Sequence, residues 1–155
     1  MKYSINLLLN SKLLWSVASA WVLAQGLKVI TSFLKEKKLK LHRFIEPGGM
    51  PSSHAAMVIA LLTGVGIKEG VPSTLFIVTL IFSMAIIYEA IGVRRAVGEQ
   101  AEVLNQIINK LPGAKKIKLQ NKEGRKYLKE ILGHSPLEVL VGSIIGLVMA
   151  LIWLR

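Results

Sequence analysis

Two short stretches contain the residues whose types and spacing indicate chemistry. One is Pro-Ser-Ser-His at residues 51–54, and the other is His-Ser-Pro-Leu-Glu at residues 134–138. His134 and Glu138 are four residues apart, so their side chains meet on a helix. A carboxylate on one ring nitrogen fixes the imidazole tautomer and makes the other nitrogen a better nucleophile or base. With His54 at the same site, one ring would attack phosphorus and the other would protonate the leaving oxygen. Such a pair hydrolyses a phosphomonoester without a metal ion.

The residues around these histidines are typical of an anion site. Ser52 or Ser53 is expected to cap a helix that begins here, leaving free backbone N–H groups at its positive end for a phosphate. Gly48 and Gly49 allow the chain to turn closely without a side chain blocking the phosphate oxygens. Arginine adds a fork of donors that suits phosphate. The remaining candidates, three cations and one carboxylate, are Lys28, Arg94, Arg95 and Glu89.

Each of these residues also has an ordinary explanation when it is taken alone. Lys28 can extend its ammonium to the lipid headgroups. Arg94 and Arg95 can be topology determinants at a helix end, and His134 can be a hydrogen-bonded structural group. The functional prediction therefore rests on the set and not on any single member.

The elements that must position this set are apolar segments. They cover residues 13–34, 52–68, 73–93 and 137–154. A helix needs about 20 apolar residues, with a range of roughly 17 to 25, to cross a bilayer. Three segments meet that length and the second lies at the lower limit. We predict an all-α integral-membrane bundle of about four transmembrane helices, formed by residues 1–155 as one domain. Short amphipathic helices at residues 99–111 and 125–132 are expected in the long segment between the last two spans.

The positive charge is concentrated in two connecting segments. The chain combines 52% hydrophobic residues with a formal net charge of +11, and the basic residues cluster in residues 35–50 and 92–136. Four crossings place both segments on one side, which the positive-inside rule makes the cytoplasmic face of the cell membrane. Every candidate residue lies toward these loops, so all share one membrane level. Nucleic-acid binding, which the charge alone would suggest, is not predicted. The lack of cysteine excludes thiolate catalysis and Cys-based zinc sites.

Three longer motifs resemble a known family: GGMPSSHAA, EAIGVRRAVGEQAEVLNQI and LKEILGHSPLEVLVGSIIG. They are similar to the divergent branch of the type 2 phosphatidic acid phosphatase superfamily, labelled acid phosphatase/vanadium-dependent haloperoxidase-related. Members of the wider superfamily bind phosphate and form a phosphohistidine. The resemblance implies that Lys28 is the lysine of the first motif and His54 the general acid. It also implies that His134 is the nucleophile and Glu138 its orienting carboxylate.

The sequence departs from the superfamily pattern at three positions. Ser53 replaces a glycine. Leu128 stands six residues before His134, where the superfamily has an arginine, so Arg94 or Arg95 would have to supply that charge. Glu89 stands where the branch commonly has Asp. The chain is also shorter than the usual six-helix member, which leaves a homodimer or a minimal core open.

The predicted function is that of a lipid phosphate phosphatase without a metal or other cofactor. Phosphatidylglycerophosphate is the preferred candidate substrate, and phosphatidic acid and prenyl phosphates are the next candidates. The alternative is a non-catalytic lipid-binding or assembly factor that retains the anion site. A transporter is less favoured because the four short segments show no inverted repeat, and a membrane-embedded site suits amphiphiles better than haloperoxidase substrates.

Overall fold

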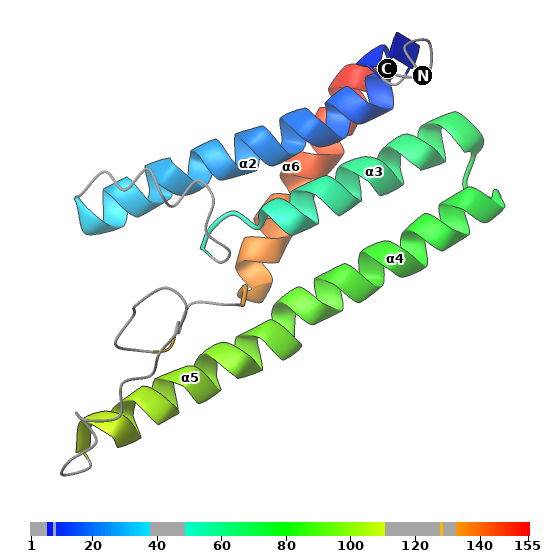
Figure 1. The fold of residues 1–155 in the computed structure, drawn as a ribbon. Helices are drawn as coiled ribbons and strands as arrows, with labels where there is room; N and C mark the ends of the chain where they lie inside the picture. Colours follow the sequence, from blue (N-terminus) through cyan, green and yellow to red (C-terminus); the bar gives the residue numbers. More distant parts are fainter. Residues whose placement is uncertain (1–5, 8, 38–48, 111–127, 129–132) are drawn as a thin grey trace.

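The computed structural model describes residues 6–7, 9–37, 49–110, 128 and 133–155, and all the regular structure in these residues is helical. The long helices are α2 (Lys12–Glu36), α3 (Ser53–Glu69), α4 (Thr74–Ile91), α5 (Val93–Lys110) and α6 (Pro136–Leu154) (Figure 1). The predicted all-α class is confirmed. The predicted apolar segments correspond to α2, α3, α4 and α6, with ends that differ by at most two residues.

A serine precedes each of these four apolar helices. The hydroxyls of Ser11, Ser52, Ser73 and Ser135 each accept a hydrogen bond from the backbone N–H three residues later. This N-cap satisfies one of the donors that a helix leaves open at its start. The helix boundaries therefore follow from local chemistry, because a capping serine stands directly before each apolar run.

The three helices α2, α3 and α6 contact one another pairwise, whereas α4 packs mainly on α3. Small residues make this core. Ala24 of α2 and Ala56 of α3 are fully buried. On α6, a Cβ at Gly142 would overlap the carbonyl oxygen of Ser52, and a Cβ at Gly146 would overlap that of Ala56. Glycine at these two positions lets the backbones of α3 and α6 touch.

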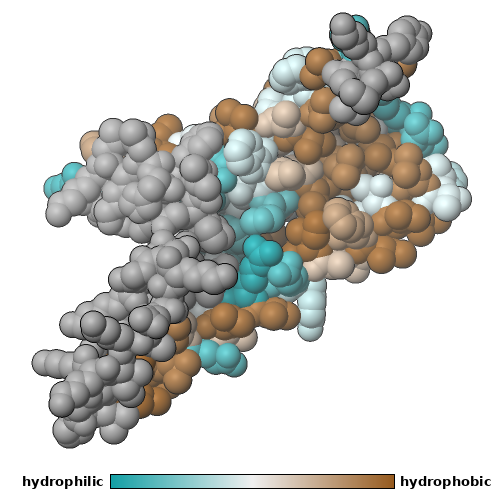
Figure 2. All heavy atoms as spheres, in the orientation of Figure 1, coloured by the Kyte–Doolittle hydropathy of each residue, from teal (hydrophilic) through white to brown (hydrophobic). Residues whose placement is uncertain are grey.

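Large apolar side chains cover the outside of the molecule. Ile81, Met84 and Ile152 are each more than 60% exposed, which in a membrane places them against lipid. Figure 2 shows apolar residues over most of the bundle, with hydrophilic residues gathered where the bundle meets α4 and α5. Among the described residues, three stretches are long and apolar enough to cross a membrane, Lys12–Leu34, Thr74–Ile108 and Pro136–Leu154. The chain is an integral membrane protein, and the count of four crossings stays a prediction because α3 has only 17 residues.

The amphipathic helix predicted at residues 99–111 is present as α5, but it begins earlier, at Val93. Gly92 makes only a local bend, with φ −92° and ψ −86°, so that α5 continues nearly along the direction of α4 (Figure 1). Arg94 and Arg95 therefore lie in the first turn of a helix. The second predicted amphipathic helix, at residues 125–132, lies outside the described residues except for Leu128.

The end of the bundle away from the basic segments is closed by tryptophans. The rings of Trp15 on α2 and Trp153 on α6 stack with centroids 6.4 Å apart. The indole N–H of Trp153 donates to Ser19 Oγ at 3.0 Å, and that of Trp15 donates to the carbonyl of Leu9 at 2.6 Å. Tryptophans with satisfied N–H groups are typical of the membrane–water interface.

Candidate functional site

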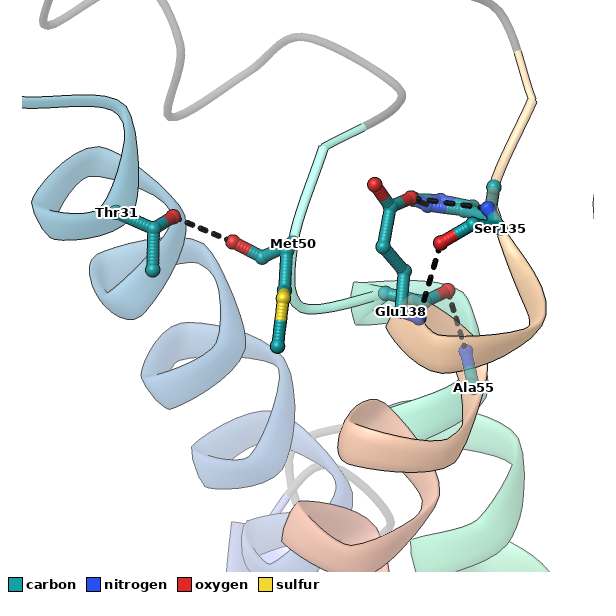
Figure 3. A network of polar contacts seen from close by, with 7 residues as sticks. Thr31, Met50, Ala55, Ser135 and Glu138 are labelled. Atoms are coloured by element: carbon teal, nitrogen blue, oxygen red, sulfur yellow. Dashed lines mark hydrogen bonds and ion pairs between the residues drawn. The ribbon is translucent and has the colours of Figure 1, made fainter. Parts of the chain in front are cut away.

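His134 and Glu138 are in contact at the start of α6. His134 Nδ1 lies 2.9 Å from Glu138 Oε2, and the His134 side chain is only 2% exposed. The same carboxylate oxygen accepts the backbone N–H of Ser135, whose hydroxyl accepts the N–H of Glu138 in return (Figure 3). Because the carboxylate only accepts, Nδ1 carries the hydrogen and the lone pair of His134 stays on Nε2.

The contact does not arise in the way the spacing suggested. His134 precedes the N-cap Ser135 and lies outside α6, so the two side chains do not meet across one helical turn. Instead, Glu138 turns back toward the helix start as the fourth member of a capping box. One carboxylate thus both closes the helix end and orients the histidine.

The backbone of His134 is fixed by the end of α4. Its N–H donates to the carbonyl of Ala90 at 3.0 Å. The preceding residue, Gly133, lies so close to α5 that a Cβ there would overlap the backbone of Arg95. The histidine is therefore held between the α4–α5 junction and the first turn of α6.

His54 lies across from His134, in the first turn of α3. The two ring centroids are 6.1 Å apart, with the ring planes at 61°. The Nδ1 atom of His54 is buried and has no hydrogen-bond partner among the described residues. The halves of the site are joined through Ser52, whose N–H donates to the carbonyl of Glu138 at 2.9 Å. The two motifs that are 80 residues apart in the sequence thus form one site.

The first turn of α3 has the geometry expected of an anion-binding helix end. Ser52 is the N-cap, and its hydroxyl accepts the N–H of Ala55 at 3.3 Å (Figure 3). Ser53 and His54 are then the first two helical residues, whose N–H groups have no acceptor within a helix. They lie at the positive end of the helix dipole. Ser53 itself is 3% exposed.

Lys28 reaches this region from α2. Its whole side chain is buried, with 1% exposed, which is not the arrangement of a lysine that extends its ammonium to the headgroups. Its Cγ lies 3.6 Å from where a Cβ of Gly49 would stand, and Gly49 has φ +83°, a conformation that favours glycine. Thr31 ties the same loop to α2 by donating to the carbonyl of Met50 at 2.6 Å (Figure 3). Gly48 lies outside the described residues.

The two arginines point to different partners. Arg94 Nε lies 2.8 Å from Glu89 Oε1, and both side chains are about half exposed. Arg95 Nε lies 3.0 Å from Glu99 Oε1, further along α5. The His54 ring is partly buried, and the titratable groups that act electrostatically on it are Arg94, His134, Lys28 and Glu89. Arg94, and not Arg95, is therefore the arginine whose charge acts on His54.

Comparison with known proteins identifies the family of the chain. Residues 9–149 match the family described as the divergent PAP2 family. The chain is also 42% identical to the "Uncharacterized membrane protein YuiD" of Bacillus subtilis (strain 168), over 153 residues that cover 96% of each chain. This protein belongs to the divergent PAP2 family. No solved structure matches the chain.

Within this divergent PAP2 chain, two buried polar residues were not predicted from the sequence. Gln25 is 5% exposed, and its Oε1 has no partner among the described residues. It stands one turn before Lys28, and the signal was its polar side chain inside the apolar run 13–34. Asn105 of α5 is 3% exposed, but the sequence offered no sign of it, because an asparagine in an amphipathic helix is expected on the exposed face.

Proposed function

We propose that this chain is an integral-membrane phosphatase that removes the phosphate from lipid phosphomonoesters. The observation that carries the proposal is the pair of histidines, with His134 Nδ1 on the Glu138 carboxylate at 2.9 Å and the His54 ring 6.1 Å away. A buried histidine whose tautomer is fixed by a carboxylate is an activated nucleophile. A second ring at this distance is close enough to act on the same phosphoryl group.

In the first step, His134 Nε2 attacks phosphorus and the bond between phosphorus and the lipid oxygen breaks. His54 gives its proton to the leaving oxygen, and the lipid departs as an alcohol. In the second step, water attacks the phosphohistidine and gives a proton to His54. Inorganic phosphate leaves, and both histidines return to their starting state.

The phosphate would be bound by Lys28, Arg94 and the first N–H groups of α3. Arg94 has to release or share Glu89 for this purpose. The Arg94–Glu89 pair is about half exposed, and exposed ion pairs contribute about 0–1 kcal/mol. A doubly charged phosphate with several donors can therefore compete with Glu89 for the guanidinium. Arg95 would take the secondary role of adding positive charge nearby.

The membrane setting favours an amphiphilic substrate with its phosphate at headgroup level. The positive-inside rule favours a site on the cytoplasmic side, because the basic segments are expected there. Phosphatidylglycerophosphate is then the preferred substrate, followed by phosphatidic acid or a prenyl phosphate. The chain contains no cysteine, so a single cysteine introduced at exposed Val97 reports sidedness. Labelling of this cysteine in intact cells by an impermeant maleimide would contradict the cytoplasmic orientation.

The activity is tested with purified protein in detergent and the three lipids as substrates. Phosphate release is measured with EDTA present, for wild type and for His134→Ala. We expect release by wild type from at least one lipid, and loss of that release in the variant. A phosphorylated histidine that is stable in alkali and labile in acid should accumulate during turnover.

The outcome that overturns the enzyme is equal inactivity of wild type and His134→Ala on all three lipids. If the wild-type protein then still binds these lipids, and His54→Ala and His134→Ala bind them as well, the chain is a lipid-binding factor instead. That alternative keeps the anion site and lacks turnover. If activity required an added metal ion, the metal-independent mechanism would be wrong, but the proposed phosphatase activity would stand.

A further inference from the structure

Asn105 is a buried polar residue of α5, and its carboxamide makes two hydrogen bonds to the backbone of Leu128. Its Nδ2 donates to the carbonyl of Leu128 at 2.9 Å, and its Oδ1 accepts the N–H of Leu128 at 3.0 Å. One side chain thus satisfies both backbone polar groups of a residue 23 positions away in the sequence, as a neighbouring strand would. This contact between Asn105 and Leu128 is called the Asn105 clamp.

The segment that begins at the clamp leads to the proposed nucleophile. Leu128 stands six residues before His134. At the other end of this segment, Gly133 packs against the backbone of Arg95, and the N–H of His134 donates to the carbonyl of Ala90. The chain entering His134 is therefore attached to the α4–α5 helices at two places. Arg95 and Asn105 are ten residues apart, or about 15 Å along the helix axis.

Helix α5 connects the proposed phosphate ligand Arg94 with the segment that leads to His134. The first turn of α5 carries Arg94, the proposed phosphate ligand, and a later turn carries the clamp. A rigid helix between them keeps the approach to His134 in a fixed relation to the arginine. If the clamp opens, Leu128 loses its two hydrogen bonds to α5. Of the described contacts between the chain before His134 and the α4–α5 helices, only those of Gly133 and of the His134 N–H then remain.

We propose that Asn105 is a positioning residue, which sets the location of His134 by anchoring the segment that delivers it. This inference rests on the proposed function, because it assigns a catalytic consequence to the alignment of His134. A displacement of about 1 Å at a reacting group can lower a rate about 10²-fold. The loss of the clamp should therefore lower kcat, while KM changes little because Lys28 and Arg94 keep their places.

The test compares Asn105→Leu, which has a similar size and no polar atoms, with the control Gln106→Leu. Gln106 is the next residue on α5 and is exposed. Among the described residues, its side chain is hydrogen-bonded only to Glu102, at 3.4 Å. We expect kcat for the lipid phosphate to fall about 10²-fold in Asn105→Leu, with KM unchanged, and neither constant to change in Gln106→Leu. An equal rise in KM and fall in kcat would indicate general damage to the site and would contradict positioning.

A second measurement does not need activity. His134 is 2% exposed, so diethyl pyrocarbonate should modify it slowly in the wild-type protein, as followed by mass spectrometry of the peptides. We expect Asn105→Leu to accelerate modification of His134 and leave the rate at His54 unchanged. Gly133→Ala forces the same segment away from Arg95 and should have the same selective effect, without altering α5.

The two measurements separate the two hypotheses. If wild type shows no phosphatase activity but Asn105→Leu selectively exposes His134, the proposed function fails and the anchoring survives. If wild type is active and Asn105→Leu keeps both the wild-type kcat and the wild-type rate at His134, the positioning role is wrong. Faster modification of both histidines would show general loosening, and this result would also overturn it.

Discussion

The two histidines of the site are held in opposite ways. His134 has its Nδ1 on Glu138, its backbone N–H on Ala90 and its preceding residue pressed against α5. His54 stands at the start of α3 with a buried Nδ1 that has no partner among the described residues. The histidine before α6 is thus fixed by several contacts, whereas the histidine of α3 has one ring nitrogen without a hydrogen bond to the described residues.

This difference matches the two roles proposed for the rings. A nucleophile must keep its lone pair aligned with phosphorus, so every restraint on His134 favours the attack. A general acid must change its protonation state twice in each turnover, and a permanent carboxylate partner would favour only its charged state. The geometry thus supports the proposed roles of His134 in attack and of His54 in proton transfer.

The largest effect is expected from the histidines themselves. His134→Asn should lower kcat by about 10⁴-fold or more for lipid and aryl phosphates alike, because no other group can form the covalent intermediate. His54→Asn should cost about 10²–10⁴-fold on a lipid but much less on an aryl phosphate, since a phenolate leaves without a proton. Steady-state rates with both substrates measure this. If the aryl phosphate restored activity to the His134 variant and not to the His54 variant, the two proposed roles would be reversed.

The next largest effect is expected at Glu138. Glu138→Gln keeps the length of the side chain but removes the charge that stabilises the imidazolium and fixes its tautomer, so kcat should fall about 10²-fold or more. The matched control is Glu69→Gln, an exposed glutamate at the far end of α3. Both rates are measured at saturating substrate. A wild-type kcat in Glu138→Gln would show that the network holds His134 without activating it.

A smaller and different effect should distinguish the two arginines. Arg94→Gln removes the proposed phosphate ligand on α5 and should raise KM about tenfold, as expected for a charged hydrogen bond. Arg95→Gln should have a smaller effect, because Arg95 is engaged with Glu99 along α5. KM for the lipid phosphate at fixed ionic strength measures both. A larger rise in Arg95→Gln would move the phosphate toward α5.

The smallest effect on activity is expected at the contact between the backbones of α3 and α6. The effect of a substitution there is expected on folding instead. In Gly142→Ala the new Cβ overlaps the carbonyl oxygen of Ser52, and such overpacking costs about 1–3 kcal/mol of folding free energy. Gly26→Ala is the control, because a Cβ there meets nothing within 4 Å and alanine in a helix interior is favoured by about 0.5–1 kcal/mol. Thermal unfolding in detergent should show a lower Tm for the first and an equal or higher Tm for the second.

Much of the fold follows from local features of the sequence. The apolar runs predicted the bounds of α2, α3, α4 and α6 to within two residues, and a capping serine stands directly before each helix. The sequence predicted which residues belong to the candidate site better than it predicted which of them contact one another. Lys28 could not be distinguished from a lysine that reaches the headgroups, since its burial depends on the loop at Gly49 and Met50. The partners of Arg94, Arg95 and Asn105 depend on where α5 begins and on packing between distant residues, which no local pattern encodes.

The tryptophan closure at the other end of the bundle provides an internal spectroscopic reference. Trp15 lies 13 residues before Lys28 on α2, about 20 Å from the site along the helix axis. Its emission, together with that of the stacked Trp153, depends on α2 and α6 remaining together. In a Trp21→Phe variant, which leaves these two tryptophans, phosphate or vanadate binding should leave this fluorescence unchanged, and separation of the helices should alter it. The fluorescence of the protein itself can thus show whether a variant that fails to bind phosphate still has a folded bundle.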